Sequence, residues 1–228
     1  MDNPIVLYGS ILVVAIIAVI VALSLVKKQQ KGNTLLILGI PDAGKTSLFT
    51  LLRYGKLAST VTSMKENEGK VAIENKSFDL VDMPGHERVR YRYLDFLPVS
   101  YKIIFVLDST TLHRQVRPVA EYLYHLLANP IVQQNKTPIF IACNKHDMFT
   151  ALPISKIKPL LEAEINRLRA TRTAAVEKQE SDNMDDQEAY LGYEGEAFQF
   201  DHVDNEIEFE QCSILKNDID KLTQWVIA

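Results

Sequence analysis

The string GIPDAGKT, Gly39 to Thr46, constrains this chain more than any other feature of its sequence. It matches G-x-x-x-x-G-K-[ST], a pattern in which a glycine-rich loop surrounds phosphate groups with backbone N–H groups. The apolar run TLLIL at 34–38 precedes it and predicts a buried strand, and residues 46–54 predict a helix. A strand, a phosphate-binding loop and a helix in this order predict an α/β domain that binds a nucleotide.

The residue types within this loop each have a chemical reason. The helix that starts near Gly44 directs the positive end of its dipole at the anion. Lys45 supplies a point charge for the β- and γ-phosphate oxygens, and the Thr46 hydroxyl is a ligand for Mg²⁺. The nucleotide-binding residues predicted here are Gly39, Asp42, Ala43, Gly44, Lys45, Thr46 and Ser47.

A second motif, DMPGH, follows a predicted strand at 78–83. Asp82 is predicted to hold Mg²⁺ through water, and the Gly85 N–H to sense the γ-phosphate and let the following segment switch. His86 stands where GTPases carry a residue that orients the attacking water, so Gly85 and His86 are the candidates for catalysis. The alternative role of His86 is packing within the switch.

No arginine finger can be assigned from the sequence. Arg88, Arg90 and Arg92 follow the second motif closely and are interpreted as a solvated or partner-facing surface. We therefore expect slow intrinsic hydrolysis and a long-lived GTP state.

The string NKHD, directly after the apolar run PIFIAC, predicts recognition of guanine. The Asp147 carboxylate can accept hydrogen bonds from N1–H and the 2-amino group of guanine, and adenine lacks both donors. Lys145 is expected to lie along the base and Asn144 to brace the phosphate loop. A backbone N–H at Cys212–Ser213 is expected to meet guanine O6. The predicted cofactors are GTP or GDP with Mg²⁺.

The threonine of the first switch that binds Mg²⁺ must lie between Thr46 and the second strand. The string STVTSM offers both Thr60 and Thr62, and spacing alone does not choose between them.

The remainder of the domain alternates between predicted strands and helices, which indicates a P-loop GTPase fold: a mostly parallel six-stranded sheet flanked by helices. The other strands are predicted at 70–73, at a sheet edge, and at 102–107, 138–143 and 206–211. The other helices are predicted at 116–128, around residues 157–168, and at 218–227.

The N-terminal part has a different character. No charged residue occurs from Asn3 to Val26, and the run from about residue 4 to 26 is long enough for one transmembrane helix. A cleaved signal peptide would need a basic start and a shorter apolar core. The bases of KKQQK follow the run instead, which places the C-terminal side in the cytosol. We predict an anchor and linker over 1–31 and a GTPase domain over 32–228.

The distribution of charged residues indicates an acidic segment and gives no sign of a nucleic-acid partner. Thirteen acids and one base lie between Glu177 and Glu210, and we predict an acidic, mobile insertion over about 173–200. The net charge of −4 gives no basic excess, so no direct nucleic-acid binding is expected. The two cysteines do not make a disulfide framework.

Three strings and the N-terminal span together resemble a known family. TVTS at 60–63, IACNKHD at 141–147 and LRATRTAA at 168–175 are similar to the beta subunits of the signal recognition particle receptor, relatives of the Arf and Sar GTPases. The resemblance runs over essentially the whole chain. It implies that Thr62 is the metal-binding threonine of the first switch.

The resemblance also implies a setting. The expected partner is the alpha subunit of the receptor in a heterodimer, docked on the GTP-bound switches. The expected place is the endoplasmic reticulum membrane, with a single span and the GTPase domain in the cytosol. Contact with the ribosome and the translocon would be indirect.

Two questions stay open at this point. An Arf- or Sar-like protein that recruits coat or trafficking partners is the alternative, although such proteins use an amphipathic or lipidated N-terminus and myristoylation needs a glycine where this chain has Asp2. The chain is either a binding module that hydrolysis slowly resets or an enzyme that cycles with a helper protein.

Overall fold

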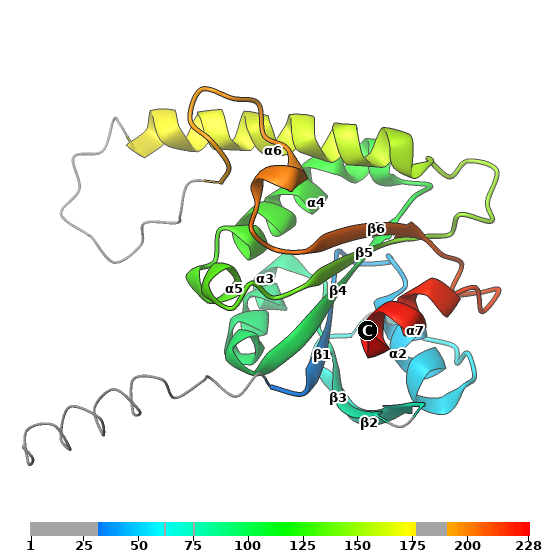
Figure 1. Ribbon diagram of the computed structural model, residues 1–228. Coiled ribbons are helices and arrows are strands. Elements are labelled where there is room, and N and C mark those ends of the chain that lie inside the picture. Colours follow the sequence, from blue (N-terminus) through cyan, green and yellow to red (C-terminus); the bar gives the residue numbers. More distant parts are fainter. Residues whose placement is uncertain (1–31, 62, 75, 177–190) are drawn as a thin grey trace, which may run out of the picture. The chain divides into compact units, whose positions relative to one another are not determined.

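Strand β1 (Thr34–Leu38) forms the centre of the domain because all five of its residues are buried and it pairs on both sides. The computed structural model describes residues 32–61, 63–74, 76–176 and 191–228 (Figure 1). β3 (Lys76–Asp82) and β4 (Ser100–Asp108) flank β1 in parallel. A strand with neighbours on both sides and helices on both faces is apolar throughout, which explains the unbroken run TLLIL.

The sheet has six strands in the order β2-β3-β1-β4-β5-β6. β5 (Ile139–Asn144) and β6 (Ile207–Gln211) extend it in parallel, and β2 (Asn67–Ile73) is the antiparallel edge strand beside β3. The prediction of a mostly parallel six-stranded sheet, with the second strand at an edge, is confirmed.

Helices cover both faces of the sheet (Figure 1). α2 (Lys45–Tyr54) and α7 (Asp220–Ile227) lie on one face, and α4 (Leu112–Leu127) and α6 (Ile154–Val176) pack against each other on the other. The apolar side chains of both layers, such as Leu48, Leu123 and Ile165, are buried in one core with the strands.

Several short elements were not predicted. These are α3 (Glu87–Arg90), the 3₁₀ helix η1 (Tyr91–Val99), α5 (Pro130–Gln134) and the 3₁₀ helix η3 (Phe200–His202). They are too short to show a helical period. α4 begins at Leu112 rather than 116, because a first turn precedes a break at Gln115, whose φ of −118° and ψ of 16° are not helical.

The prediction of an acidic insertion over 173–200 needs correction at both ends, whereas residues 177–190 lie outside the described part. α6 continues to Val176, and Leu191, Phe198 and Phe200 are buried. The returning chain is fastened by the Arg169 guanidinium, which donates to the carbonyls of residues 191 (2.9 Å), 193 (3.3 Å) and 196.

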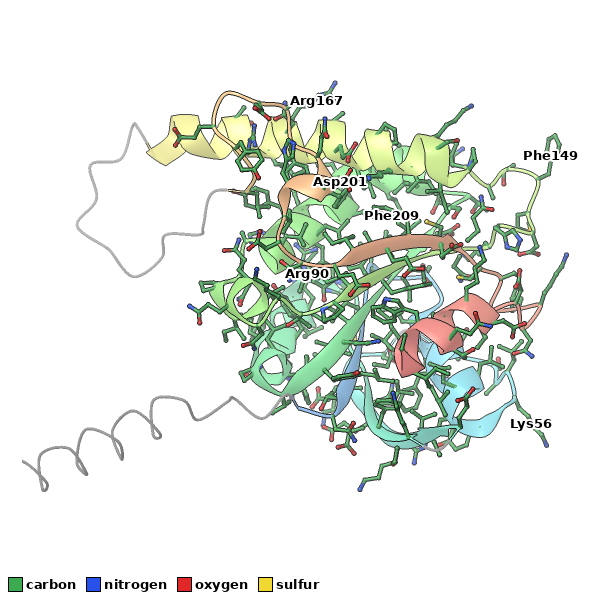
Figure 2. All side chains as sticks on the ribbon, in the orientation of Figure 1. Lys56, Arg90, Phe149, Arg167, Asp201 and Phe209 are labelled. Atoms are coloured by element: carbon green, nitrogen blue, oxygen red, sulfur yellow. The ribbon has the colours of Figure 1, made fainter. Side chains whose placement is uncertain are left out.

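Arg169 differs in this respect from its neighbour Arg167. Arg167 lies on the outer surface of α6, and its guanidinium pairs with Glu164 of the same helix (Figure 2). A buried guanidinium that satisfies three backbone carbonyls compensates polar groups that water cannot reach. This gives the string LRATRTAA a structural role that the alternation of strands and helices did not suggest.

The predicted membrane span at 4–26 lies outside the described residues. Within the four described ranges, no helix combines the length and the apolar character that crossing a membrane requires.

Candidate functional site

The carboxyl ends of the parallel strands meet at one edge of the sheet, and the predicted site residues lie there. Register pairs Ile37 with Asp82 and Asp108 with Asn144, which brings the ends of β1, β3, β4 and β5 together. Ligands of open α/β sheets bind at this edge. The structure has a cavity of about 560 Å³ at this place.

Five separated stretches of chain line the cavity. They contribute Pro41, Asp42, Gly44, Lys45, Thr46 and Ser47; Thr60, Val61 and Ser63; Met83, Pro84 and Gly85; Asn144 and Lys145; and Ile214 and Leu215. The volume and the mixture of backbone, hydroxyl and charged groups suit a nucleotide.

The phosphate loop has the backbone that its glycines predicted. Gly44, the residue before α2, has a φ of 105°, and a Cβ there would lie 2.4 Å from Asn144 Nδ2. A Cβ at Gly85 would lie 2.6 Å from Lys45 Nζ. Gly44 therefore leaves room at the first turn of α2, and Gly85 leaves room beside the Lys45 ammonium group. A side chain at either position would fill that space. Gly39 follows β1 directly and Ala43 is buried within the loop.

Lys45 is buried at the base of the cavity, where its Nζ donates to the Ile40 carbonyl over 2.7 Å. Burial lowers the pKa of Lys45 to about 8, although Asp82 and Asp42 act in the opposite direction. A lysine that is costly to charge in the empty loop gains from any anion that enters it, so its environment favours phosphate binding.

This pKa predicts how nucleotide affinity depends on pH. Because the charged form of Lys45 attracts phosphate, GDP affinity should be flat from about pH 6.5 to 7.5. It should fall as pH rises past 8, by up to tenfold per unit, because Lys45 in the empty site then loses its proton. Lys45→Arg, which stays charged, should abolish this fall. Titration calorimetry from pH 6.5 to 8.8 checks this, and a flat profile for the unaltered chain would contradict it.

The predicted metal ligands Thr46 and Asp82 are in contact. The Thr46 hydroxyl donates to Asp82 Oδ2 over 2.8 Å, and the Asn67 amide donates to the same oxygen over 2.9 Å. Burial raises the pKa of Asp82, and the hydrogen bonds from Asn67 and Thr46 oppose that rise. Asp82 Oδ1 is buried and has no hydrogen-bond partner within the described residues. Such an oxygen fits a water bound to Mg²⁺, and these oxygen donors are of the type that Mg²⁺ prefers.

Asn144 joins the base-binding motif to the phosphate loop, as predicted. Its Nδ2 donates to the Ala43 carbonyl over 2.8 Å, and its Oδ1 accepts from the Ile214 N–H over 3.1 Å. Lys145 also reaches the loop, because its Nζ donates to the Asp42 carbonyl over 3.1 Å.

Sequence reasoning missed Asp108, which ends β4. Lys145 Nζ lies 2.7 Å from Asp108 Oδ2. Burial alone would raise the pKa of Asp108, but the hydrogen bonds from Lys145 and Thr110 outweigh it and lower that pKa. The ionised carboxylate holds the lysine stem in one direction, where the base is expected to stack. The signal for Asp108 was present: an acid that ends a buried parallel strand lies at the same edge as the other site residues.

Asp147 is not among the residues that line the cavity, but two neighbouring side chains hold its carboxylate. Its Oδ1 accepts from the Ser213 hydroxyl over 2.7 Å, and Lys216 Nζ lies 3.7 Å from Oδ2. The Ser213 hydrogen bond is the main cause of a lowered pKa for Asp147. The carboxylate is therefore ionised at neutral pH, and as an acceptor-only group it suits the two adjacent donors of guanine.

The structure revises the roles of Cys212 and Ser213. The Cys212 N–H donates to the Cys143 carbonyl over 3.0 Å, and the Ser213 N–H donates to the Asp218 carbonyl over 3.1 Å. Both N–H groups are thus used within the protein, and the next two residues, Ile214 and Leu215, form the cavity wall instead. Ser213 acts through its hydroxyl on Asp147.

Only some of the residues predicted for the two switches line the cavity. Gly85 and Thr60 line the cavity, and Thr62 lies outside the described residues, so its metal role stays a prediction. His86 is exposed and directly precedes α3 as its N-cap, where its Nδ1 accepts from the Arg88 N–H over 3.3 Å. It borders a neighbouring depression of about 250 Å³ that also includes Pro41 and Gly85. In this conformation His86 is not in the nucleotide cavity.

The fold and the arrangement of this site are those of a small GTPase. The family model described as the signal recognition particle receptor beta subunit matches residues 30–207. The beta subunit of Rattus norvegicus is 35% identical over 208 residues, which cover 88% of this chain and 77% of that protein. The chain therefore belongs to the family of signal recognition particle receptor beta subunits.

Solved structures agree with this family membership. The mammalian signal recognition particle receptor superposes with a TM-score of 0.75 at 34% identity, covering 85% of this chain and 97% of that one. The receptor beta subunit of Chaetomium thermophilum, solved with GDP and Mg, has a TM-score of 0.66 at 27% identity over 86% of this chain and 98% of that one. Membership of this family favours the receptor function over an Arf- or Sar-like coat recruiter.

Proposed function

We propose that the chain is the GTP-binding, membrane-anchored subunit of a signal recognition particle receptor, and that GTP shapes its two switch segments into a docking surface for the receptor's alpha subunit. One observation carries the proposal: the wall of the nucleotide cavity is continuous in sequence with an exposed apolar surface. Val61 and Gly85 line the cavity, and exposed apolar side chains follow each of them in sequence.

This surface, here called the switch surface, consists of Val61, Met64, Tyr91 and Leu94. Their exposed fractions are 88%, 66%, 62% and 42%. Exposed large apolar side chains on two segments that a ligand can move are suited to a partner that distinguishes nucleotide states. An ion pair of 2.7 Å between Glu66 and Arg92 ties the two segments together, so a shift of one is passed to the other.

The nucleotide would be held as the site's geometry suggests. Lys45 and the N-terminus of α2 would bind phosphates, Thr46 and Asp82 would hold Mg²⁺, and Asp147 would select guanine. Mg²⁺ would neutralise phosphate charge. His86 lies outside the cavity, and no arginine of the described residues lines it. We infer slow intrinsic hydrolysis, so that GTP binding rather than turnover would set the docked state.

The N-terminal segment would supply the membrane attachment. Residues 4–26 carry no charge and are followed by Lys27, Lys28 and Lys31, which favours a single span with the GTPase domain, residues 32–228, in the cytosol. By its family, the membrane is that of the endoplasmic reticulum, and the docked receptor would serve ribosomes and the translocon indirectly. Extraction with alkaline carbonate should leave the chain in the pellet, whereas release would favour a peripheral Arf-like attachment.

Docking is tested by capture of the alpha subunit on the full chain in detergent, with GTP, with GDP and without nucleotide. We expect capture with GTP to exceed capture with GDP by tenfold or more, since a two-state surface needs differential affinity of this order. Tyr91→Glu on the switch surface should abolish capture. Phe149→Glu is the matched control, because Phe149 is fully exposed on the loop after β5 and projects away from the domain (Figure 2).

Two results would contradict the proposal. One is equal capture in all nucleotide states. The other is equal loss of capture in the Tyr91 and Phe149 variants, because docking would then not depend on the switch surface.

A further inference from the structure

Asn67, the first residue of β2, contacts the metal-binding end of the site, although no motif marks it. The β2–β3 register places Asn67 directly opposite Asp82, and side chains so opposed in an antiparallel pair have Cβ atoms about 5 Å apart. The Asn67 Nδ2 donates to Asp82 Oδ2 over 2.9 Å and to the Ser63 hydroxyl over 3.1 Å. One amide thus joins the first switch segment to the carboxylate that ends β3.

The two oxygens of Asp82 have different surroundings. Oδ2 accepts from Asn67 and from the Thr46 hydroxyl, whereas Oδ1 is buried without a partner among the described residues. A carboxylate fixed through one oxygen presents the other in a constant direction. The Thr46 hydroxyl would also have to bind the metal, whereas the Asn67 nitrogen is a donor without a lone pair for a metal and serves only Asp82 and Ser63 among the described residues.

We propose that Asn67 is a positioning residue for the Mg²⁺ of the bound nucleotide, acting by orienting Asp82. The inference rests on the proposed binding of a guanine nucleotide with Mg²⁺. Groups that orient metal-bound ligands, here the water that Asp82 would hold, typically contribute 10- to 100-fold to metal affinity, and Asn67 would fix the direction of that carboxylate. Through Ser63, which lies 3.4 Å from the Thr46 hydroxyl, the same amide couples the first switch segment to the metal end of the cavity.

The test distinguishes an effect on Mg²⁺ binding from an effect on nucleotide binding. The full chain in detergent is loaded with N-methylanthraniloyl-GDP, and release is followed at free Mg²⁺ concentrations from EDTA to about 10 mM, a range chosen to bracket ordinary Mg²⁺ sites. The variants are Asn67→Leu, which keeps the volume without the donor, and Asn67→Ala. The matched control is Glu68→Gln, because the neighbouring Glu68 is exposed and its side chain points to the opposite face of the strand. Thermal melting without Mg²⁺ verifies that each variant is folded.

We expect the release rate in EDTA to change less than about twofold in both Asn67 variants. The Mg²⁺ concentration that half-maximally slows release should rise about tenfold or more in both, and stay unchanged in Glu68→Gln. A metal midpoint that stays the same in folded Asn67 variants would overturn the inference. So would faster release in EDTA with an unchanged midpoint, because that would indicate general loosening of the strand.

The failure of this inference differs from failure of the proposed function. If the unaltered chain binds the GDP derivative and Mg²⁺ slows its release, the nucleotide site stands whatever Asn67 does. If the unaltered, folded chain does not bind the derivative at all, both the proposed function and the inference fail.

Discussion

Lys45→Ala is expected to reduce the affinity for GTP and GDP by on the order of 100-fold to several thousand-fold. Lys45 is 6% exposed, and its ammonium group lies at the floor of the phosphate loop beside Gly85. Removing one partner of a buried charged pair costs about 3–5 kcal/mol, because the other charge is left without compensation. Here that other charge is the phosphate of the nucleotide. Equilibrium binding of a fluorescent GDP derivative measures the loss.

The control for this prediction is Lys56→Ala. Lys56 is an exposed lysine just beyond the end of α2, so its removal changes the net charge equally without touching the cavity (Figure 2). It should leave affinity within about twofold, as expected for surface substitutions. If Lys45→Ala is folded and binds GDP as tightly as Lys56→Ala, the phosphate site is not at 39–46.

Asp147→Asn is expected to exchange guanine preference for xanthine preference. Guanine offers two adjacent donors to the carboxylate, and an asparagine amide would set its own donor against the 2-amino group. Xanthine carries an oxygen at that position, which accepts from the amide. GTP affinity should fall by about 100-fold or more, and xanthosine triphosphate should become the preferred ligand, because unpaired polar groups give the strongest discrimination. The Ser213 hydroxyl can still donate to the asparagine oxygen, so the loop should keep its shape.

Competition of GTP and xanthosine triphosphate for one labelled nucleotide measures this exchange. The matched control is Asp204→Asn, because Asp204 is an exposed acid that pairs with Lys136 just before β6 and belongs to none of the strings that predict base recognition. It should leave the preference for GTP unchanged. A folded Asp147→Asn variant that still prefers GTP would show that another group reads the base.

The sheet and most of the site could be predicted from the sequence, because each buried parallel strand is an apolar run that ends at a recognisable motif. Gly39 directly follows β1, Asp82 is the last residue of β3, and Asn144 is the last residue of β5. The position of each could therefore be predicted from the end of an apolar run. The phosphate loop, the brace by Asn144 and the edge position of β2 were all predictable in this way.

What could not be predicted depends on contacts between distant segments. Asn67 reaches Asp82 only through the β2–β3 register, which a hairpin with no strong turn signal does not fix in advance. Leu191, Phe198 and Phe200 are packed although acids surround them in the sequence, because Arg169 fastens that segment. Ile214 and Leu215 form part of the cavity wall, whereas the N–H groups of Cys212 and Ser213 donate to carbonyls within the protein, and no sequence pattern indicates this arrangement.

The central claim is a guanine-nucleotide site at the carboxyl edge of the sheet, and equilibrium binding of radiolabelled GTP to the full chain in detergent with Mg²⁺ tests it most directly. The account predicts saturable binding of one GTP per chain that GDP displaces and that a 100-fold excess of ATP does not, since adenine lacks the N1–H and 2-amino donors that Asp147 would bind. A folded chain that binds no GTP, or from which ATP displaces GTP as well as GDP does, would contradict it.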